Sequence, residues 1–294
     1  KELYRLYQQH PVITTDSRDV PADSIFFALK GETFDGNQYA RAALDKGAAY
    51  AVVDDPAVAV GTDMVVVPDV LTVLQQLARH HRRQLGTTVI GITGTNGKTT
   101  TKELIANVLK KKYNVLYTQG NFNNHIGVPK TLLQLTADHQ IAVIEMGANH
   151  PGEIKTLVDI ACPDYGIITN VAKAHLEGFG SFEGVIRTKG ELYDNLRQHD
   201  GTVFINNDND YLKEIGHGLH LVKYGRKSAS DLLVQGELLE CNPFVKFCWN
   251  QPAKEGKDAD GGPCSSHTVQ TRLIGSYNLD NLLAAACIGK FFTV

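Results

Sequence analysis

The chain has 294 residues, a net charge of −3 and five scattered cysteines without C-x-x-C spacing. This composition allows two domains and argues against a broad nucleic-acid surface, a disulfide framework and a zinc site. No apolar run approaches the ~20 residues that span a bilayer, and no signal peptide is visible. We expect a soluble, cytoplasmic, monomeric protein without a nucleic-acid partner or membrane insertion.

Residues 1–85 are predicted to form a small α/β domain. Apolar, β-branched runs predict strands, and longer amphipathic stretches predict helices. The expected strands are 12–16, 24–29, 48–54 and 64–67, and the expected helices are 37–46 and 71–85. Gly86 follows a helix whose basic residues lie near its C-terminal end, and it marks the expected domain boundary.

Two loops of this first domain carry polar residues beside glycine. They span residues 15–18 (T-D-S-R) and 30–36 (K-G-E-T-F-D-G), and each follows a predicted strand. Their spacing alone is compatible with a ligand-binding role and equally with ordinary turns capped by Asp or Ser side chains.

Residues 86–294 are predicted to form a second domain with a mostly parallel sheet flanked by helices, because strands and helices alternate. The expected strands are 88–92, 115–118, 141–144, 165–171 and 202–205, and the expected helices are 98–112, 130–135, 151–160, 182–196 and 279–292. Residues 119–129 are predicted to be a loop. Residues 232–239 and 244–249 indicate a small antiparallel addition, and 251–266 a polar surface loop. The overall fold class is therefore α/β.

A glycine-rich turn lies between the first strand and the first helix of this domain. A strand, a glycine loop and a helix N-terminus in this order make a phosphate site, because backbone N–H groups and the helix dipole face the anion. The expected nucleotide contacts are Gly94, Thr95, Asn96, Gly97, Lys98, Thr99 and Thr100. Lys98 would reach the β- and γ-phosphates, and the Thr99 hydroxyl would bind Mg²⁺. The longer P-loop pattern has glycine where this chain has Ile92, so the match is to the shorter form G-T-N-G-K-T.

Two further strands carry chemical residues at or just after their carboxyl ends, where ligands bind in open parallel sheets. Glu145 ends one strand and would supply an oxygen ligand for Mg²⁺. His175 follows another strand, and Lys189 lies on a predicted helix. From spacing alone, Glu145 could instead be an exposed strand end, His175 a packed or surface histidine, and Lys189 an exposed helix residue.

Six segments of the chain together resemble the Mur ligases of peptidoglycan synthesis. They are G-T-N-G-K-T-T (94–100), G-N-F-N-N-H-I-G-V-P (120–129), I-E-M-G-A-N-H-P-G-E-I (144–154), A-H-L-E-G-F-G-S (174–181), T-K-G-E-L-Y (188–193) and G-S-Y-N-L-D-N-L-L-A-A (275–285). Within the family, they are most similar to the members that add D-alanyl-D-alanine to UDP-MurNAc-tripeptide. The loops 15–18 and 30–36 also match the family's N-terminal, UDP-binding domain.

The resemblance implies a role for each matching residue. Thr99 and Glu145 would bind one Mg²⁺, and His175 would help to hold a second. Lys189 would be carbamylated, which turns a cation into a carboxylate-like metal ligand. With Lys98, His175 and Lys189 would form the catalytic set, and Asn278 would contact adenine. The implied UDP-substrate residues are Ser17, Arg18, Lys30, Gly31, Thr33, Phe34, Asp35 and Gly36, with Asn121 and Asn124 near the reacting carboxylate.

The implied reaction is ATP-driven amide formation through an acyl phosphate. Lys98 and two Mg²⁺ ions would neutralise the phosphates while the tripeptide carboxylate attacks. D-alanyl-D-alanine would then displace phosphate. These ligases have a third, C-terminal domain, and the chain ends before it, so we expect little activity from the chain alone.

Two other classes of function stay open at this point. One is a sibling amide ligase, such as the Mur ligase that adds the third stem residue or a folylpolyglutamate synthetase, although the latter lacks the UDP-type loops. The other is a P-loop nucleotide-binding module without ligase chemistry. A GTPase is disfavoured because the chain has no N-K-x-D motif.

Overall fold

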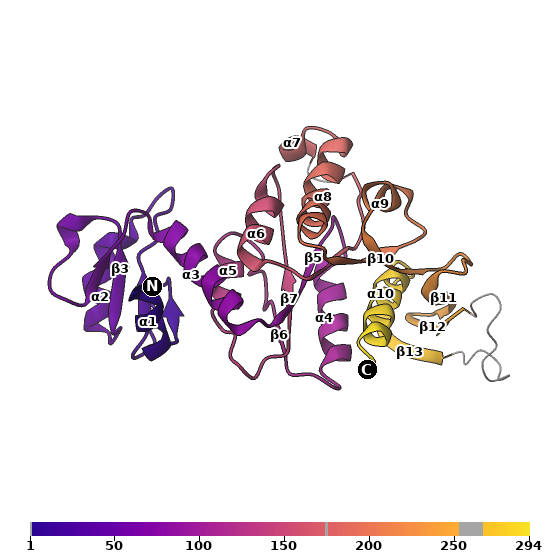
Figure 1. Cartoon of the computed structure of the whole chain (residues 1–294), viewed down its shortest axis with the longest axis horizontal. Helices are drawn as coiled ribbons and strands as arrows, with labels where there is room; N and C mark the ends of the chain where they lie inside the picture. Colours follow the sequence, from indigo (N-terminus) through magenta and orange to yellow (C-terminus); the bar gives the residue numbers. More distant parts are fainter. Residues whose placement is uncertain (1, 174–175, 253–266) are drawn as a thin grey trace. The chain divides into compact units, whose positions relative to one another are not determined.

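The computed structural model describes residues 2–173, 176–252 and 267–294 (Figure 1). The chain forms two compact units. Unit 1 comprises Lys1–Gly86 and His125–Ala137, and unit 2 comprises Thr87–Asn124 and Asp138–Val294. The predicted boundary at Gly86 coincides with the first crossing between the units. Residues 125–137, which the sequence analysis assigned to the second domain, belong to unit 1.

Unit 1 is built on a parallel sheet of four strands among its described residues, in the order β1-β2-β3-β4. The strands are β1 (Ile13–Thr14), β2 (Ile25–Phe27), β3 (Tyr50–Val53) and β4 (Met64–Val66). The helices are α1 (Glu2–Gln9), α2 (Ala40–Asp45), α3 (Val70–Leu85) and α5 (Gly127–Leu132), with short 3₁₀ turns η1 (Gly36–Tyr39) and η2 (Pro56–Val58). The predicted helix 37–46 is therefore split, with a 3₁₀ turn before α2.

Capping explains where α3 begins and ends. The Asp69 side chain accepts a hydrogen bond from the Thr72 N–H (2.7 Å), and Gly86 takes the left-handed conformation (φ 65°) that ends a helix without strain. Pro129 lies in the first turn of α5, where proline is tolerated because its missing N–H would have no partner. The helix therefore begins at Gly127, inside the predicted loop 119–129.

Hydrogen bonds between distant residues anchor residues 125–137 in unit 1. The Tyr7 hydroxyl donates to the Leu133 carbonyl (2.5 Å), His81 Nε2 lies 2.9 Å from the Leu135 carbonyl, and Gln75 donates to the His125 carbonyl (3.0 Å). Tyr7 and His81 are both buried. These bonds link residues more than 45 positions apart, so no local sequence pattern indicates them.

Unit 2 contains a nine-stranded sheet in its described part, in the order β13-β12-β11-β10-β9-β8-β5-β7-β6. Its strands are β5 (Thr88–Thr93), β6 (Val115–Tyr117), β7 (Ile141–Glu145), β8 (Tyr165–Ile168), β9 (Thr202–Asn206), β10 (His220–Gly225), β11 (Leu232–Cys241), β12 (Phe244–Asn250) and β13 (His267–Ile274). Strands β5 to β11 pair in parallel, and β11, β12 and β13 pair antiparallel, which confirms the α/β class and the predicted antiparallel addition.

The helices of unit 2 pack around this sheet (Figure 1). They are α4 (Lys98–Leu109), α6 (Glu153–Ala161), α7 (Leu176–Phe179), α8 (Phe182–Gln198), α9 (Asp210–Ile215) and α10 (Asn278–Phe291). Elements α1, α7, α9, β10 and β13 were not predicted from the sequence. No helix among the described residues has the length and apolar character that crossing a bilayer requires.

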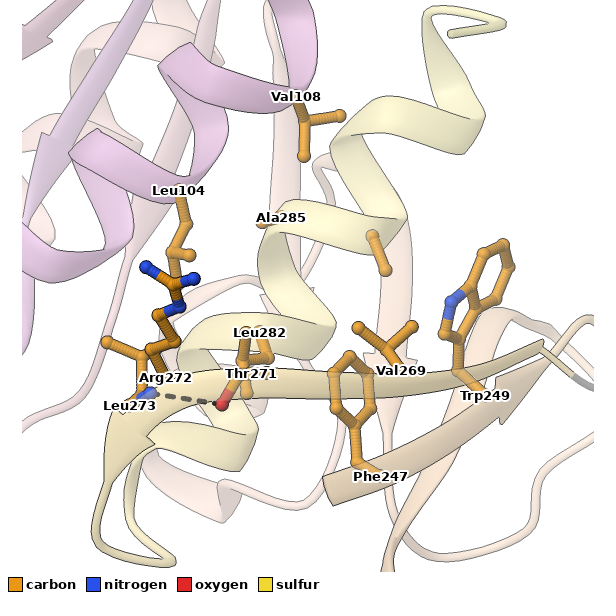
Figure 2. A pocket seen from close by; sticks show the side chains of 11 residues that line it. Leu104, Val108, Phe247, Trp249, Val269, Thr271, Arg272, Leu273, Leu282 and Ala285 are labelled. Atoms are coloured by element: carbon orange, nitrogen blue, oxygen red, sulfur yellow. Dashed lines mark hydrogen bonds between the residues drawn. The ribbon is translucent and has the colours of Figure 1, made fainter. Parts of the chain in front are cut away.

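A cavity of about 430 Å³ lies between α4, α10, β12 and β13 (Figure 2). Apolar side chains form most of its lining, including Leu104, Phe247, Trp249 and Leu282. The antiparallel strands therefore do not close completely against the two helices.

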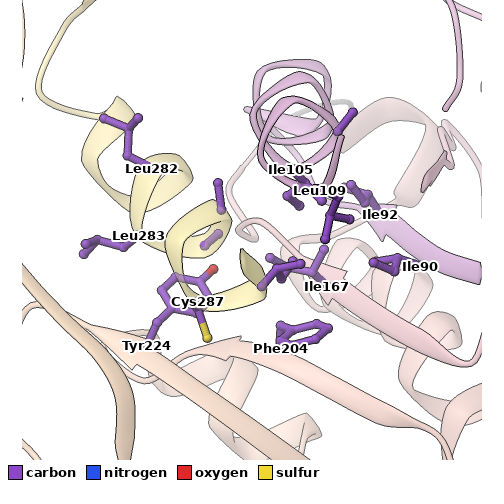
Figure 3. Close-up of a cluster of buried hydrophobic side chains, with 14 of the residues drawn as sticks. Ile90, Ile92, Ile105, Leu109, Ile167, Phe204, Tyr224, Leu282, Leu283 and Cys287 are labelled. Carbon is purple, nitrogen blue, oxygen red and sulfur yellow. The ribbon is translucent and has the colours of Figure 1, made fainter. Parts of the chain in front are cut away.

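The main core of unit 2 lies where α4 and α10 cover the central strands (Figure 3). Ile90 and Ile92 of β5 and Phe204 of β9 pack with Leu109 of α4 and Leu283 of α10, and all five are buried. Helix α10 is apolar on nearly every side, as expected of a helix enclosed by neighbours. The core thus fixes β5 and α4, the two elements that flank the glycine-rich turn.

Candidate functional site

The glycine-rich turn has a positive φ, which favours glycine, at two positions. Gly94 has φ 145°, and a Cβ there would collide with the Thr169 side chain. Gly97 has φ 76°, and a Cβ there would lie 2.8 Å from Asn281 Oδ1. The first N–H groups of α4, which begins at Lys98, have no acceptor within the helix and remain available to an anion.

The segment after β8 holds the outer side of this turn. Thr169 Oγ1 donates to the Asn96 carbonyl (2.6 Å), and the Asn96 N–H donates to Asn170 Oδ1 (3.1 Å). The Ala172 N–H donates to Thr95 Oγ1 (3.1 Å). The sequence analysis did not single out Thr169 or Asn170, because their role depends on the pairing of β5 with β8. The turn is therefore braced from a neighbouring strand end.

The Lys98 side chain folds back over the glycine-rich turn. Its Nζ donates to the carbonyls of Gly94 (3.0 Å) and Thr95 (3.2 Å). Burial lowers the pKa of Lys98, and the nearby Glu145 carboxylate opposes this shift. An ammonium that donates to these two carbonyls can exchange them for phosphate oxygens, which are stronger, charged acceptors.

Glu145 is in contact with Thr99, the other predicted ligand of the first Mg²⁺. It ends β7 with 1% of its surface exposed. The Thr99 hydroxyl lies 3.2 and 3.1 Å from the two carboxylate oxygens, and Asn123 Nδ2 donates to Oε1 (3.0 Å). The expectation that Thr99 and Glu145 lie together is confirmed by these distances. Asn123 was missed because three asparagines of one loop have the same local pattern.

Lys102 also belongs to this cluster, although the sequence analysis gave it no role. Its side chain is fully buried, and its Nζ lies 3.8 Å from Glu145 Oε2 and 3.2 Å from Glu103 Oε1. Lys102 follows Thr99 by three residues, a spacing that places two side chains on the same helix face. The three-residue spacing from Thr99 is the sequence feature that could have identified Lys102 as a site residue.

Lys189 lies on α8 and is 3% exposed. Its Nζ donates to the Ala148 carbonyl (3.3 Å) and lies 5.2 Å from the centre of the Phe179 ring. Burial and then the positive charge of Lys98 lower the pKa of Lys189 to about 8, while Glu153 and Glu191 act in the opposite direction. The structure therefore places Lys189 within the electrostatic reach of the phosphate-loop lysine, and not on an exposed helix face.

The described residues offer a donor set that suits Mg²⁺ bound together with phosphate. They contain no group of three His, Cys, Asp or Glu side chains arranged as a metal site. Mg²⁺ commonly takes one or two protein carboxylates and completes its shell with phosphate and water oxygens. The Thr99 hydroxyl and the Glu145 carboxylate fit that pattern. His175, the predicted ligand of a second Mg²⁺, lies outside the described residues.

Asn278 begins α10 and takes part in a buried chain of hydrogen bonds. Its Nδ2 donates to the Ile274 carbonyl (2.9 Å), and its Oδ1 accepts from Asn281 Nδ2 (3.0 Å). Asn281 Oδ1 in turn accepts from the Thr101 hydroxyl (3.0 Å). These bonds use one hydrogen and one lone pair of the Asn278 amide. Its contact with adenine stays a prediction.

The roles of Asn121 and Asn124, in the asparagine-rich loop 119–129, stay predictions as well. The Asn121 carbonyl accepts from the Asn123 N–H (2.7 Å), and the Asn123 carbonyl accepts from the Gly147 N–H (2.8 Å). These bonds hold the loop against the end of β7.

In unit 1, the predicted substrate loops follow the carboxyl ends of β1 and β2, which are adjacent parallel strands. Asp16 accepts from Arg18 Nε (2.9 Å) and Nη2 (2.8 Å), and both side chains are exposed. The Ser17 carbonyl accepts from Lys46 (2.6 Å). The two loops thus share one edge of the sheet.

The loop 30–36 is closed by its own contacts. The Gly31 N–H donates to the Phe34 carbonyl (2.9 Å), and the Gly36 N–H donates to the Leu29 carbonyl (2.9 Å). A Cβ on Gly31 would collide with the Phe34 ring, and one on Gly36 with the Leu29 backbone. Phe34 is 54% exposed, and Thr33 is exposed beside it. A closed loop that presents an aromatic ring to solvent suits a binding surface.

The comparisons with known families cover both units. The Mur ligase middle domain matches residues 92–289, and the Mur ligase family catalytic domain matches residues 11–82. The first match spans the phosphate loop, Glu145 and Lys189.

Named relatives and solved structures agree with this match. The UDP-N-acetylmuramoyl-tripeptide–D-alanyl-D-alanine ligase of Haemophilus influenzae is 43% identical over 72% of the chain and 48% of its own length. The ligase of the same name from Escherichia coli is 42% identical over 94% of the chain and 59% of its own length. The structure of the MurF ligase from Thermotoga maritima with ADP superimposes with a TM-score of 0.83 at 28% identity, over 100% of the chain and 64% of that structure.

The chain therefore spans about half to two thirds of the length of the proteins it matches. The family match covers most of the chain, and it includes the braced glycine turn together with the carboxylate at the end of β7. The chain belongs to the Mur ligase family.

Proposed function

We propose that the chain binds ATP and UDP-MurNAc-tripeptide for an ATP-dependent ligase that adds D-alanyl-D-alanine to the tripeptide in the cytoplasm. The observation that carries the proposal is the contact between the Thr99 hydroxyl and the Glu145 carboxylate at the start of α4. The names of the relatives and the ADP complex of the Thermotoga maritima structure support it.

The nucleotide site would use the turn from Gly94 to Gly97 and the first residues of α4. Backbone N–H groups there would bind the phosphates, and Lys98 would move from the carbonyls of Gly94 and Thr95 to phosphate oxygens. Asn278 would contact adenine at the start of α10.

Thr99 and Glu145 would hold one Mg²⁺, and His175 and Lys189 a second. Bound Mg²⁺ would neutralise charge on the phosphates and favour attack by a carboxylate. The lowered pKa of Lys189 supports carbamylation, because CO₂ reacts with the neutral amine. A lysine with a lowered pKa is neutral more often near pH 7 than an exposed lysine.

The reaction would proceed in two steps. The terminal carboxylate of the tripeptide attacks the γ-phosphate of ATP, which releases ADP and leaves an acyl phosphate. The amine of D-alanyl-D-alanine then attacks the acyl carbon, and phosphate leaves. Lys98 would stabilise the negative charge that spreads over the transferred phosphoryl oxygens in the first step.

The UDP-sugar would bind to unit 1, on the loops 15–18 and 30–36. Arg18 and Lys30 would face the diphosphate, and the exposed Phe34 would pack on a ring of the substrate. Asn121 and Asn124 would lie near the reacting carboxylate. We propose that the chain acts as a monomer, which its mass in solution tests.

The first test is equilibrium binding by the 294-residue chain, because the chain spans only part of the length of its relatives. We expect ADP binding that strengthens with Mg²⁺, together with binding of UDP-MurNAc-tripeptide. Lys98→Ala should weaken ADP binding at least ~100-fold, because a charged hydrogen bond to phosphate is lost. Tight GTP binding without tripeptide binding would refute the ligase and indicate a nucleotide switch.

A further inference from the structure

Lys102 is a lysine that the fold buries completely beside the Glu145 carboxylate. The exposed fractions of the two side chains are 0% and 2%. Within the described part of the chain, Lys102 Nζ has no hydrogen-bond acceptor in favourable geometry. Burying an ammonium without hydrogen bonds is unfavourable, so fold stability alone does not account for a lysine at this position.

The charge of Lys102, more than its hydrogen bonding, acts on Glu145. Thr99 and Asn123 already bind the carboxylate oxygens at 3.0–3.2 Å, whereas Lys102 Nζ lies 3.8 Å away. The orientation of the carboxylate therefore does not depend on Lys102. Glu103, at 3.2 Å, is the other carboxylate near this ammonium, and it is 45% exposed. Lys98 is a second cation whose field reaches Glu145.

We propose that Lys102 sets how tightly Glu145 binds Mg²⁺. Its buried charge balances the carboxylate when no metal is present, and it repels Mg²⁺ when the metal binds. Because Thr99 and Asn123 keep the carboxylate in place, the repulsion outweighs any loss of orientation when Lys102 is removed. A moderate hold on Mg²⁺ favours its departure together with ADP after the reaction. Lys102 thus acts on Mg²⁺ through its charge beside Glu145, and its role rests on the proposed function because that function places Mg²⁺ at Glu145.

The first experiment measures Mg²⁺ affinity directly. The EDTA-stripped chain is mixed with ADP, and Mg²⁺ is titrated while ADP binding is followed by calorimetry. Lys102→Met should shift the Mg²⁺ midpoint at least ~10-fold lower than wild type, because a buried repulsive charge is removed. Lys110→Met is the matched control, since Lys110 is an exposed lysine next to α4 that contacts the Tyr117 ring (4.0 Å), and its midpoint should not move. An unchanged or higher midpoint for Lys102→Met overturns the proposal.

The second experiment stays informative if Lys102→Met folds poorly. Thermal unfolding is compared in EDTA for wild type, Lys102→Met, Glu145→Gln and the double variant. Each single variant should lower the Tm, because it leaves one buried charge unbalanced, and the double variant should regain most of that loss. Additive losses would show that the two charges are not coupled and would overturn the proposal.

The controls separate this inference from the proposed function. A wild-type chain that binds no ADP in the presence of Mg²⁺ refutes the proposed function, and the role of Lys102 falls with it. A wild-type chain that binds Mg²⁺ and ADP, with a Lys102→Met variant of equal Mg²⁺ midpoint, refutes the inference alone.

Discussion

Each unit of the molecule carries a carboxylate at the carboxyl end of a parallel strand, and a lysine and an asparagine accompany each carboxylate. In unit 1, Asp54 follows β3, pairs with Lys30 at 2.8 Å and accepts from Asn37 (2.8 Å). In unit 2, Glu145 ends β7, accepts from Asn123 (3.0 Å) and lies 3.8 Å from Lys102.

The two clusters differ in how completely their polar groups are satisfied. Burial alone would raise the pKa of Asp54, but Lys30 and Asn37 outweigh it, and the pKa lies below its usual value. Asn37 also accepts from the backbone N–H groups of Asp54 and Asp55. The first cluster therefore closes a turn of the fold. In the second cluster, the Lys102 ammonium lies near two carboxylates but makes no hydrogen bond of favourable geometry with the residues that the structure describes, and such an arrangement suits a site that a ligand completes.

The largest expected effect comes from breaking the first cluster. Asn37→Ala should lower the free energy of unfolding by about 3 kcal/mol, because Asn37 is buried and its loss removes the acceptor of the Asp54 and Asp55 N–H groups and one donor to the Asp54 carboxylate. Urea unfolding measures the change. ADP affinity should not change, because the nucleotide site lies in unit 2. A loss below about 1 kcal/mol would show that water replaces these bonds.

A smaller effect is expected at the corresponding asparagine of unit 2. Asn123→Ala should weaken Mg²⁺-dependent ADP binding about tenfold, because Glu145 loses one of the two donors that orient it. The free energy of unfolding of Asn123→Ala should change little, since the loop that holds Asn123 is partly exposed. Asn121→Ala in the same loop is the comparison: an equal or greater loss there would favour the original prediction of Asn121 over Asn123.

The smallest effect concerns pH and belongs to unit 1. Burial lowers the pKa of His81, the Leu135 carbonyl opposes this shift, and His80 adds to it. The unfolded chain therefore binds a proton more readily than the folded one, so stability is full above about pH 6.5 and falls as the pH decreases through that value. Stability should therefore fall between pH 7.5 and pH 5.5.

Thermal unfolding of wild type and His81→Gln at both pH values measures this effect. The variant should lose that part of the pH dependence, because glutamine does not titrate. Tyr4 and Tyr7 also face His81 but stay neutral in this range. An identical pH dependence in the variant would assign the effect to other histidines.

The sequence predicted the parts of the fold that depend on local pattern. The strand ending at Glu145 and the turn before Lys98 follow from apolar runs, glycine placement and the strand–loop–helix order. The contact of Thr99 with Glu145 then follows from the rule that parallel strands present their carboxyl ends at one edge. The family resemblance added roles for Lys189 and Asn278 that spacing could not supply.

The remaining features depend on contacts between distant parts of the chain. The choice of Asn123 among three asparagines is made by the hydrogen bond that its carbonyl accepts from Gly147. The burial of Lys102 depends on the position of β7 beside α4. The assignment of residues 125–137 depends on Tyr7 and His81, which lie far away in sequence. Helix α1 has the amphipathic pattern of a helix, but it is only eight residues long and was missed for that reason.

Because residues 125–137 belong to unit 1, the polypeptide passes between the units three times, near positions 86, 124 and 137. Neither unit is a continuous stretch of sequence. A gene fragment ending at Gly86 would leave the Tyr7 hydroxyl and the His81 ring without their carbonyl acceptors, whereas a single proteolytic cut at any one passage would still leave the two units tethered through the others.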